Sequence, residues 1–399
     1  MAILYNLDMN SIHRELKIKE ILQNRSAFLF GPRQTGKSWL IRNELANCRV
    51  FNLLDSTTYL RLSREPHRLR QEILPDDHIV VIDEIQKIPS LLDEIHLLIE
   101  ERGIKFLLTG SSARKLRSQG TNLLGGRARM NVMHPFVKKE LGDAFDLHKA
   151  LTTGLLPSIY FSPEPNEDLE AYTGVYLQEE ISAEAAVRNI PSFSRFLTVA
   201  ALYHGHIINF SNIASDAQVS RTTVQNYFQI LQDTLIIKEL PAWSKTVKRK
   251  ATTTAKFYFF DTGVARILQK RKSLAPGTTE FGEAFEGYLF HELISWIDYH
   301  GGGDLAFWRS VSGYEVDFIL DNSIAIEVKA KKTVANHDLK GLRALKEETS
   351  FDKYIVVSLE DVERLVDGIQ ILPWDIFLDR LWQGDYRAES CQRGDPLQA

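Results

Sequence analysis

The sequence has few cysteines and no long hydrophobic run. Its 399 residues include only Cys48 and Cys391, which are too few and too far apart for a disulfide framework or a metal knuckle. No apolar stretch approaches the roughly 20 residues that a transmembrane helix needs, and the N-terminus lacks the charged-then-apolar pattern of a signal peptide. We therefore expect a cytoplasmic protein with no membrane partner.

A strong excess of one charge is also missing, as are internal repeats and low-complexity tracts. The formal net charge of −4 argues against a uniformly basic nucleic-acid binder but leaves room for local basic patches. We see no sign of a repeat array. With 44% apolar residues, the length allows two or three domains with real cores.

What is present is a phosphate-binding loop. Residues Gly31–Ser38 fit the pattern G-x-x-x-x-G-K-[ST]. The apolar run Ala27–Phe30 before it predicts a buried parallel strand, and Trp39–Leu45 after it predicts a helix. In such loops the lysine, here Lys37, reaches the β- and γ-phosphates of ATP, and the hydroxyl of Ser38 ligates Mg²⁺. We assign nucleotide contact to Gly31, Pro32, Arg33, Gln34, Thr35, Gly36, Lys37 and Ser38.

An apolar run that ends in two carboxylates predicts the second half of the nucleotide site. Ile79–Glu84 has the pattern of a central parallel strand, whose C-terminal end opens onto the ligand crevice of an α/β sheet. Asp83 is placed to hold Mg²⁺ through water. Glu84 is placed to orient and deprotonate the attacking water. The alternative is a solvated strand end.

Two further groups are candidates for contact with the γ-phosphate. The strand predicted over Lys105–Ser112 ends in hydroxyls, and in P-loop ATPases a polar residue there senses the γ-phosphate; we prefer Ser111 to Thr109. Arg127 is the candidate arginine finger, acting in its own chain or in a neighbouring subunit of a homo-oligomer. Its rivals are Arg129 and Arg33. Strand-end capping and surface exposure are the alternatives.

The residue pattern in the middle of the chain is typical of a winged helix. Phe210–Phe228 predicts a helix-turn-helix whose second helix is capped by Ser220. Gln218 stands where a turn glycine often provides a positive φ. Leu235–Leu240 would be a wing strand. Polar residues on the outer face of the second helix are suited to DNA contact, namely Arg221, Gln225 and Asn226. The alternative is a structural lid that touches no DNA.

A basic stretch follows, in which only Asp261 carries the opposite charge. Such clustering attracts a phosphate backbone, and a solvated polar face is the alternative. The nucleic-acid candidates taken from it are Lys248, Arg249 and Lys250. The stretch as a whole comprises Lys245, Lys248, Arg249, Lys250, Lys256, Arg266, Lys270, Arg271 and Lys272.

The helix predicted over Phe281–Tyr299 carries one anomalous carboxylate. Glu286 shares a face with apolar residues three, four, seven and eleven positions away. A carboxylate in an apolar stripe is costly unless it is paired or bound to a cation. Glu283 and Glu292 fall on sides that look more polar and ordinary.

Two strands joined by a turn complete a candidate metal site. In Tyr314–Leu320 and Ile324–Lys329, strand periodicity places Glu327 beside Lys329, and the hairpin brings Asp317 near them. Carboxylates with one lysine suit Mg²⁺-assisted phosphodiester hydrolysis. The alternative is an amphipathic hairpin with a surface salt bridge. The predicted metal ligands are Glu286, Asp317 and Glu327, with Lys329 assisting.

Together these motifs resemble a broad prokaryotic family of AAA-superfamily ATPases with a C-terminal domain of unknown function. The matching pieces are GPRQTGKS from Gly31, VVIDEIQ from Val80, LLTGSS from Leu107, GGRAR from Gly125, FFDTG from Phe259, FEGYLFHEL from Phe285, and WRSVSGYEVDFIL with AIEVKA between Trp308 and Ala330. The C-terminal part looks like the restriction-endonuclease-like fold, whose acidic-Asp-Glu-x-Lys pattern maps onto Glu286, Asp317, Glu327 and Lys329.

We therefore expect an α/β protein in three parts and a tail. These are a P-loop NTPase (AAA-like) core with a parallel sheet over 1–162, a helical and winged-helix region over 163–274, a C-terminal α/β restriction-endonuclease-like domain over 275–386, and a disordered tail over 387–399. The leading hypothesis is an ATPase, with ATP and Mg²⁺ as cofactors, whose nucleotide state controls DNA binding or Mg²⁺-dependent cleavage. A nucleotide-dependent switch or scaffold that cleaves nothing, and a transcription regulator, are the alternatives.

Overall fold

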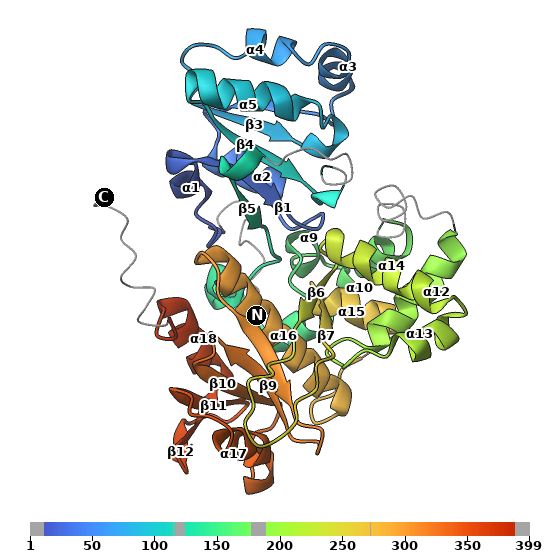
Figure 1. Ribbon diagram of the computed structural model, residues 1–399, viewed down its shortest axis with the longest axis vertical. Coiled ribbons are helices and arrows are strands. Elements are labelled where there is room, and N and C mark those ends of the chain that lie inside the picture. The colour runs from blue at the N-terminus through green and yellow to red at the C-terminus, as the bar shows by residue number, and fades with distance from the viewer. Residues whose placement is uncertain (1–11, 115, 117–123, 177–188, 272, 388–399) are drawn as a thin grey trace.

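The computed structural model describes residues 12–114, 116, 124–176, 189–271 and 273–387. The last twelve positions of the predicted tail, 388–399, lie outside them. Three sheets organise the described residues, with five, six and two strands. Figure 1 shows the five-stranded sheet at one end of the molecule and the six-stranded sheet at the other, with the small sheet beside the long helix α16 (Thr279–Tyr299).

The first sheet is parallel throughout, in the order β2-β3-β4-β1-β5. Strand β1 (Ser26–Phe30) is buried on both faces, as expected for a parallel sheet between helices. Phe28 and Phe30 pack in one hydrophobic cluster, and Ala27 and Leu29 pack in another. The strands are β1 (Ser26–Phe30), β2 (Arg49–Asn52), β3 (Ile79–Asp83), β4 (Lys105–Gly110) and β5 (Ala128–Val132). The helices around it are α1 (Ile18–Asn24), α2 (Lys37–Glu44), α3 (Ser56–Arg64), α4 (Arg68–Glu72) and α5 (Leu91–Arg102).

The short helices after this sheet pack away from it. Val137, Leu151 and Tyr160 belong to the same hydrophobic cluster as α16 and the six-stranded sheet. The predicted region 1–162 therefore contains two packing environments. These helices are α7 (Lys138–Leu141), α8 (Leu147–Thr153), α9 (Pro157–Tyr160) and α10 (Pro165–Ala171).

In residues 189–271 of the predicted winged-helix region, three helices precede two antiparallel strands and a further helix. Gln218 adopts the left-handed turn conformation (φ 55°) between the second and third helices, in the position where a glycine was expected. The Ser220 hydroxyl caps the third helix by accepting the Thr223 N–H at 3.1 Å. The elements are α12 (Ile190–Leu202), α13 (Phe210–Ala217), α14 (Arg221–Asp233), β6 (Ile237–Leu240), β7 (Lys256–Phe259) and then α15 (Thr262–Leu268).

The C-terminal sheet is mixed, in the order β12-β13-β11-β10-β9-β8. β8, β9 and β10 are antiparallel neighbours, whereas β10, β11 and β13 run parallel. Its elements after α16 are β8 (Leu305–Arg309), β9 (Glu315–Leu320), β10 (Ile324–Lys329), α17 (Lys340–Lys346), β11 (Lys353–Ser358), β12 (Arg364–Val366), β13 (Ile369–Pro373) and α18 (Trp374–Gln383).

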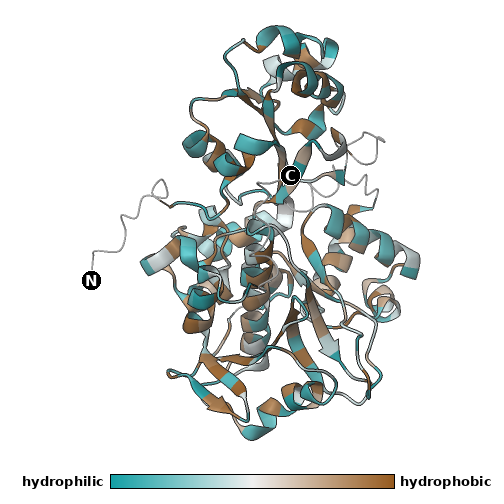
Figure 2. Cartoon of the chain, turned by 60° about the vertical axis from the view of Figure 1, so that its left-hand side comes forward, coloured by the Kyte–Doolittle hydropathy of each residue, from teal (hydrophilic) through white to brown (hydrophobic). Residues whose placement is uncertain are grey.

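Hydrophobic residues gather along the strands and on the packed sides of the helices (Figure 2). α16 is the longest element, yet within the described ranges no helix combines the length and apolar character needed to cross a bilayer.

The connection between β6 and β7 lies along the edge of the C-terminal sheet. The Trp243 N–H donates to the Phe307 carbonyl of β8 at 2.7 Å, and the Thr252 N–H to the Arg309 carbonyl at 2.8 Å. This connection, residues 241–255, therefore covers backbone groups that an edge strand would leave unpaired.

Candidate functional site

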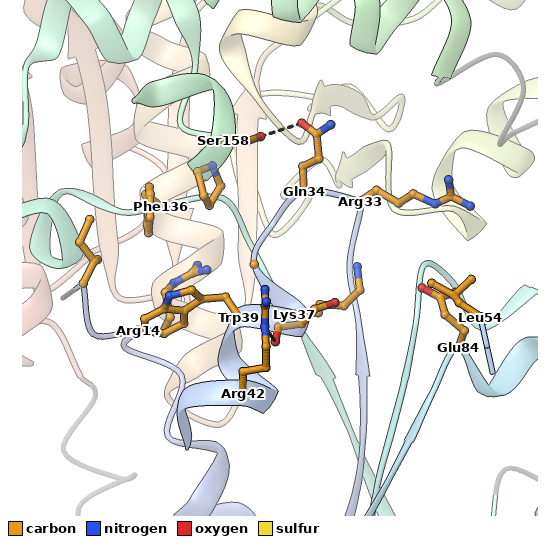
Figure 3. Close-up of a pocket in the computed structure, with 14 residues that line it drawn as sticks. Arg14, Arg33, Gln34, Lys37, Trp39, Arg42, Leu54, Glu84, Phe136 and Ser158 are labelled. Atoms are coloured by element: carbon orange, nitrogen blue, oxygen red, sulfur yellow. Dashed lines mark hydrogen bonds between the residues drawn. The ribbon is translucent and has the colours of Figure 1, made fainter. Parts of the chain in front are cut away.

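A large pocket lies at the phosphate-binding loop. It has a volume of about 490 Å³ and is lined by the loop and the start of α2, together with Arg14, Glu84 and Phe136. In Figure 3, Lys37 lies between Arg14 on one side and Glu84 and Leu54 on the other. Gln34 joins the far wall, because the Ser158 hydroxyl donates to its side-chain oxygen at 2.8 Å. The strand-loop-helix context predicted for the motif is present.

The loop conformation depends on its two glycines. Gly36 has φ 98°, a conformation that favours glycine, and directly precedes helix α2. A Cβ on Gly31 would lie 2.4 Å from the Met133 carbonyl oxygen, so only glycine allows this close approach. The Lys37 ammonium donates to the carbonyls of Gly31 at 2.6 Å and of Pro32 at 3.0 Å. It is therefore held at the loop itself, beside the N-terminus of a helix, where anions bind.

The two carboxylates at the end of β3 have different environments. Asp83 is 7% exposed and accepts a hydrogen bond from the hydroxyl of Thr109 on β4. Glu84 lines the pocket with φ 63°. Burial raises the pKa of Glu84, Lys37 opposes the shift, and Asp83 adds to it. A carboxylate with a raised pKa is a better base.

Gln86 connects Glu84 to the end of β4, and the sequence analysis did not single it out. Its amide nitrogen donates to the Glu84 carboxylate and, at 3.4 Å, to the Ser111 hydroxyl. Gln86 therefore links the preferred sensor, Ser111, to Glu84. The rival sensor, Thr109, contacts Asp83 directly. The structure places both hydroxyls at the same sheet edge as the phosphate-binding loop.

The donors present fit Mg²⁺ bound together with a nucleotide. Ser38 lines the pocket, and Asp83 lies at the end of β3, which β4 separates from β1. Hydroxyl and carboxylate oxygens are the hard ligands that Mg²⁺ prefers, usually few in number and completed by phosphates and water. Ser38 and Asp83 are the residues that would hold the ion.

Arg127 and its rival Arg129 do not reach this pocket. They flank the start of β5, which runs parallel to β1 with Ala128 opposite Ser26. The loop follows the other end of β1, so the length of the strand separates them, about 16 Å for five residues. Arg127 instead pairs with Glu100 of α5. This geometry excludes Arg127 as a finger within its own chain, and a finger from a neighbouring subunit stays a prediction. Arg33, by contrast, lines the pocket.

Arg14 was missed, although it lies in the pocket wall. Its guanidinium donates to the Thr35 carbonyl of the loop at 2.6 Å and pairs with Glu140 of α7 at 2.9 Å. It also lies 3.5 Å from the Tyr299 hydroxyl at the end of α16. Arg14 thus joins the loop to the C-terminal part of the molecule. No local pattern could reveal this residue, because its partners lie 21 to 285 positions away.

The nucleic-acid candidates divide into outward and inward residues. Arg221, Gln225 and Asn226 are exposed on α14, as are Lys248 and Lys250 on the connection between β6 and β7.

Arg249 points inward. It pairs with Glu347 at 2.6 Å and with Glu348 at 2.8 Å. Glu348 is buried and also accepts the backbone N–H groups of Val247, Lys248 and Arg249. Arg249 therefore anchors the connection.

Other members of the predicted basic stretch are also engaged by the protein. Arg266 is 4% exposed and donates to the Thr152 carbonyl at 2.5 Å, and Arg271 pairs with Glu283 at 2.7 Å. Lys256 is 3% exposed. The stretch is thus less basic at the surface than its composition suggests, because charge counting ignores direction.

The C-terminal carboxylates lie together, and lysines hold them. Lys329 pairs with Glu327, and the Val328 N–H donates to Asp317 at 2.8 Å. Lys256 of β7 lies 3.2 Å from Glu286. Burial, and then the charge of Glu286, raises the pKa of Asp317 to about 6. Burial, and then Asp317, raises the pKa of Glu327 further above its ordinary value.

This arrangement does not fit the predicted Mg²⁺ ligand set. Over the described ranges, no three Asp, Glu, His or Cys side chains lie together so as to hold a metal ion. Lysines already pair with two of these carboxylates: Lys256 with Glu286 and Lys329 with Glu327. The ligand roles predicted for Glu286, Asp317 and Glu327 are therefore not supported by the arrangement as it stands.

Glu292 corrects the sequence interpretation of α16. It looked ordinary, yet it is fully buried (0% exposed). It accepts the Lys138 N–H at 2.7 Å, the Tyr288 hydroxyl at 2.9 Å and the Trp382 N–H at 2.8 Å. Through these hydrogen bonds, Glu292 connects α16 to α7 and α18. The prediction failed because α16 is covered on several sides, so no face of it is simply polar.

Comparisons with known proteins match three separate stretches of the chain. Residues 23–142 match a family model described as an AAA domain. Residues 144–275 and 281–377 match two domains of unknown function, DUF8612 and DUF4143. The first match supports an AAA-type ATPase, and hence nucleotide binding, in this part of the chain.

The similar curated proteins carry no assigned function. Uncharacterized proteins of Mycobacterium bovis and Mycobacterium tuberculosis are each 27% identical over 320 residues, covering 76% of this chain and 70% of theirs. An uncharacterized protein of Haemophilus influenzae is 20% identical over 401 residues, covering 90% of this chain and 97% of its own.

Proposed function

We propose that this protein binds and hydrolyses Mg²⁺-ATP and that its nucleotide state controls its binding to nucleic acid, namely DNA. The observation that carries the ATPase part is a pocket of about 490 Å³ that Lys37 and Glu84 line at one sheet edge, with Asp83 next to Glu84 at the end of β3. Lys37 follows β1, whereas Asp83 and Glu84 stand together at the end of β3, and β4 separates these two strands, so their convergence reflects the fold.

The roles of the residues follow from their positions. Lys37 and the backbone N–H groups at the start of α2 bind the β- and γ-phosphates. Ser38 and Asp83 hold Mg²⁺, which neutralises phosphate charge. Glu84 takes a proton from the attacking water, a role that its raised pKa favours. Thr109 and Gln86 fix the two carboxylates in place.

The nucleic-acid part of the proposal rests on the middle and C-terminal regions. The exposed residues Arg221, Gln225 and Asn226 lie on α14 with side chains suited to phosphates and base edges. The C-terminal order of a helix, three antiparallel strands, a helix and a parallel strand, with Asp317, Glu327 and Lys329 adjacent, supports a restriction-endonuclease-like relationship.

The first test is ATP turnover by the full chain. We expect Lys37→Ala to lower phosphate release at least about 100-fold, because it removes the cation at the reacting phosphates. Lys17→Ala, which changes an exposed lysine of the same region, should behave like the wild type. Equal turnover by wild type and Lys37→Ala would remove the ATPase proposal.

A second candidate is a nucleotide-dependent switch whose C-terminal domain binds partners without cleaving. The observation that favours it is the pairing of Glu286 with Lys256 and of Glu327 with Lys329. It predicts ATP turnover without salt-sensitive DNA binding. A filter-binding series at several salt concentrations separates the two candidates, since contact with phosphates makes affinity fall with salt.

A further inference from the structure

Carbonyl groups of the phosphate-binding loop accept hydrogen bonds from the protein itself. The Lys37 ammonium donates to the carbonyls of Gly31 and Pro32, and the Thr35 hydroxyl donates to that of Pro32 at 2.8 Å. A carbonyl oxygen that faced the pocket would repel a phosphate, because both groups carry negative charge on oxygen. Such a loop binds phosphate when its carbonyls are turned away and its N–H groups face the anion.

The Thr35 carbonyl receives a donor from outside the loop. Arg14, which lies 21 positions earlier in the chain, donates to it through Nη1 at 2.6 Å. The described residues contain no cis peptide bond, and in a trans peptide group the carbonyl and the N–H point in opposite directions. The N–H of Gly36, a residue that lines the pocket, therefore points away from Arg14.

The residues on either side of this peptide group do not fix its orientation. Glycine adopts positive and negative φ with similar ease, so the φ of 98° at Gly36 is not the only conformation open to it. The hydrogen bond from Thr35 to Pro32 engages the side chain of Thr35 and not its carbonyl. The donor from Arg14 is thus what favours the observed orientation over the reversed one.

Arg14 is itself held firmly. Its side chain is 2% exposed, and its Nε pairs with Glu140 at 2.9 Å. Its Nη2 donates to the His134 carbonyl at 2.7 Å, and the guanidinium carbon lies 5.1 Å from the centre of the Phe136 ring. All three guanidinium nitrogens therefore donate to acceptors of the protein. This arrangement suits a residue that acts on the nucleotide through the loop.

We propose that Arg14 is a positioning residue of the ATPase site, which holds the Thr35–Gly36 peptide group in the orientation that presents the Gly36 N–H to the phosphates. The loop is then organised before ATP arrives, and the nucleotide does not have to turn the peptide group on binding. The inference rests on the proposed ATPase function and adds to it a residue that lies outside the phosphate-loop pattern.

The test is steady-state ATP turnover by the full chain carrying Arg14→Ala. Without Arg14 the peptide group divides between two orientations, and the apparent affinity falls by the fraction in the binding orientation. We expect KM to rise at least about tenfold, as for the loss of one hydrogen bond to a charged group. We expect kcat to stay close to the wild-type value, because the bound complex keeps Lys37 and Glu84. Guanidinium ion added to the assay should fill the space left by Arg14→Ala and lower KM again.

Two controls separate positioning from a loss of stability. Arg25→Ala removes an exposed arginine of the same region and should keep the wild-type KM. Glu140→Gln removes the charged partner of Arg14 and leaves the contact with Thr35 in place, so it should lower the thermal midpoint with little change in KM. An equal rise of KM in Glu140→Gln and Arg14→Ala would show that destabilisation is the cause and would overturn the inference.

An unchanged KM in folded Arg14→Ala, a fall of kcat at unchanged KM, or a raised KM that guanidinium does not lower also overturns the inference. If Arg14→Ala does not fold, Arg14→Met combined with Glu140→Gln takes its place, because this pair leaves no buried charge without a partner. The same rise of KM is then expected, and an unchanged KM overturns the inference.

The proposed function and this inference fail in different ways. A wild-type protein that neither turns over ATP nor binds a non-hydrolysable analogue removes the proposed function. A wild-type protein that does both, beside an Arg14→Ala protein with the same KM and the same affinity for the analogue, removes only the role of Arg14.

Discussion

The nucleotide pocket and the C-terminal carboxylate cluster both gather charge at the end of a sheet, but they satisfy it differently. The pocket is open, with a volume of about 490 Å³, and the cations that line it, including Lys37 and Arg33, surround space for an external ligand. In the cluster, Lys256 and Lys329 already sit against Glu286, Glu315 and Glu327. A sequence motif shows which charged residues are present. Only the fold shows whether another residue of the protein or an external ligand neutralises them.

The largest expected effect comes from Glu84→Gln, which tests whether the nucleotide pocket hydrolyses ATP. We expect turnover to fall about 10²- to 10⁴-fold, the usual contribution of a general base, while nucleotide binding persists because Lys37 and the loop are untouched. Phosphate release and nucleotide binding should be measured on the same preparation. Glu101→Gln, an exposed carboxylate of the same region, serves as the control, and unchanged turnover in Glu84→Gln would exclude the base role.

Glu292 sharpens the comparison, because it is a buried carboxylate that no lysine ammonium neutralises. Two backbone or ring N–H groups and a tyrosine hydroxyl donate hydrogen bonds to it instead. Burial raises its pKa to about 7 from 4.5. A raised pKa in the folded state means that its contribution to stability is complete below pH about 4.5 and is lost as the pH rises through about 7. We expect the free energy of unfolding in Glu292→Gln to depend less on pH in this window, by up to about 3 kcal/mol.

Urea denaturation at several pH values between 4.5 and 7.5 measures this difference. The matched control is Glu280→Gln, an exposed residue of the same helix, which should keep the wild-type pH dependence. Identical profiles for Glu292→Gln and wild type would show that folding does not raise the pKa of Glu292.

The smallest expected effect separates an outward arginine from an inward one. Arg221→Ala should weaken DNA binding several-fold and lower the slope of log affinity against log salt by about one. Arg249→Ala should leave DNA affinity unchanged and lower the thermal midpoint, because the buried carboxylate of Glu348 loses its charged partner. Fluorescence anisotropy at three salt concentrations tests the first effect and thermal unfolding the second. Reversed outcomes would place the DNA-binding face on the β6–β7 connection.

The features that the sequence predicted well are local ones. The strand, loop and helix around Lys37 follow from apolar runs and glycine positions, and Gln218 takes the positive φ expected of its turn position. Ile324, Ile326 and Val328 pack together in the core, which leaves Glu327 and Lys329 on the other face of the strand. Periodicity of two or 3.6 residues carries this information within one element.

The features that the sequence did not predict depend on contacts between distant elements. Arg14 reaches Tyr299, and Lys256 reaches Glu315, only after the parts of the chain have packed. Glu292 looked polar because its coverage by α7 and α18 is not visible in the pattern of α16 alone. Arg127 looked like a finger because motif order says nothing of which sheet edge it occupies.

The most direct measurement is a calorimetric titration of the full chain with a non-hydrolysable ATP analogue in the presence of Mg²⁺. The account predicts saturable binding of one nucleotide per chain and its loss in Lys37→Ala. Wild-type protein that shows no heat of binding, or that binds equally well after Lys37→Ala, would contradict it.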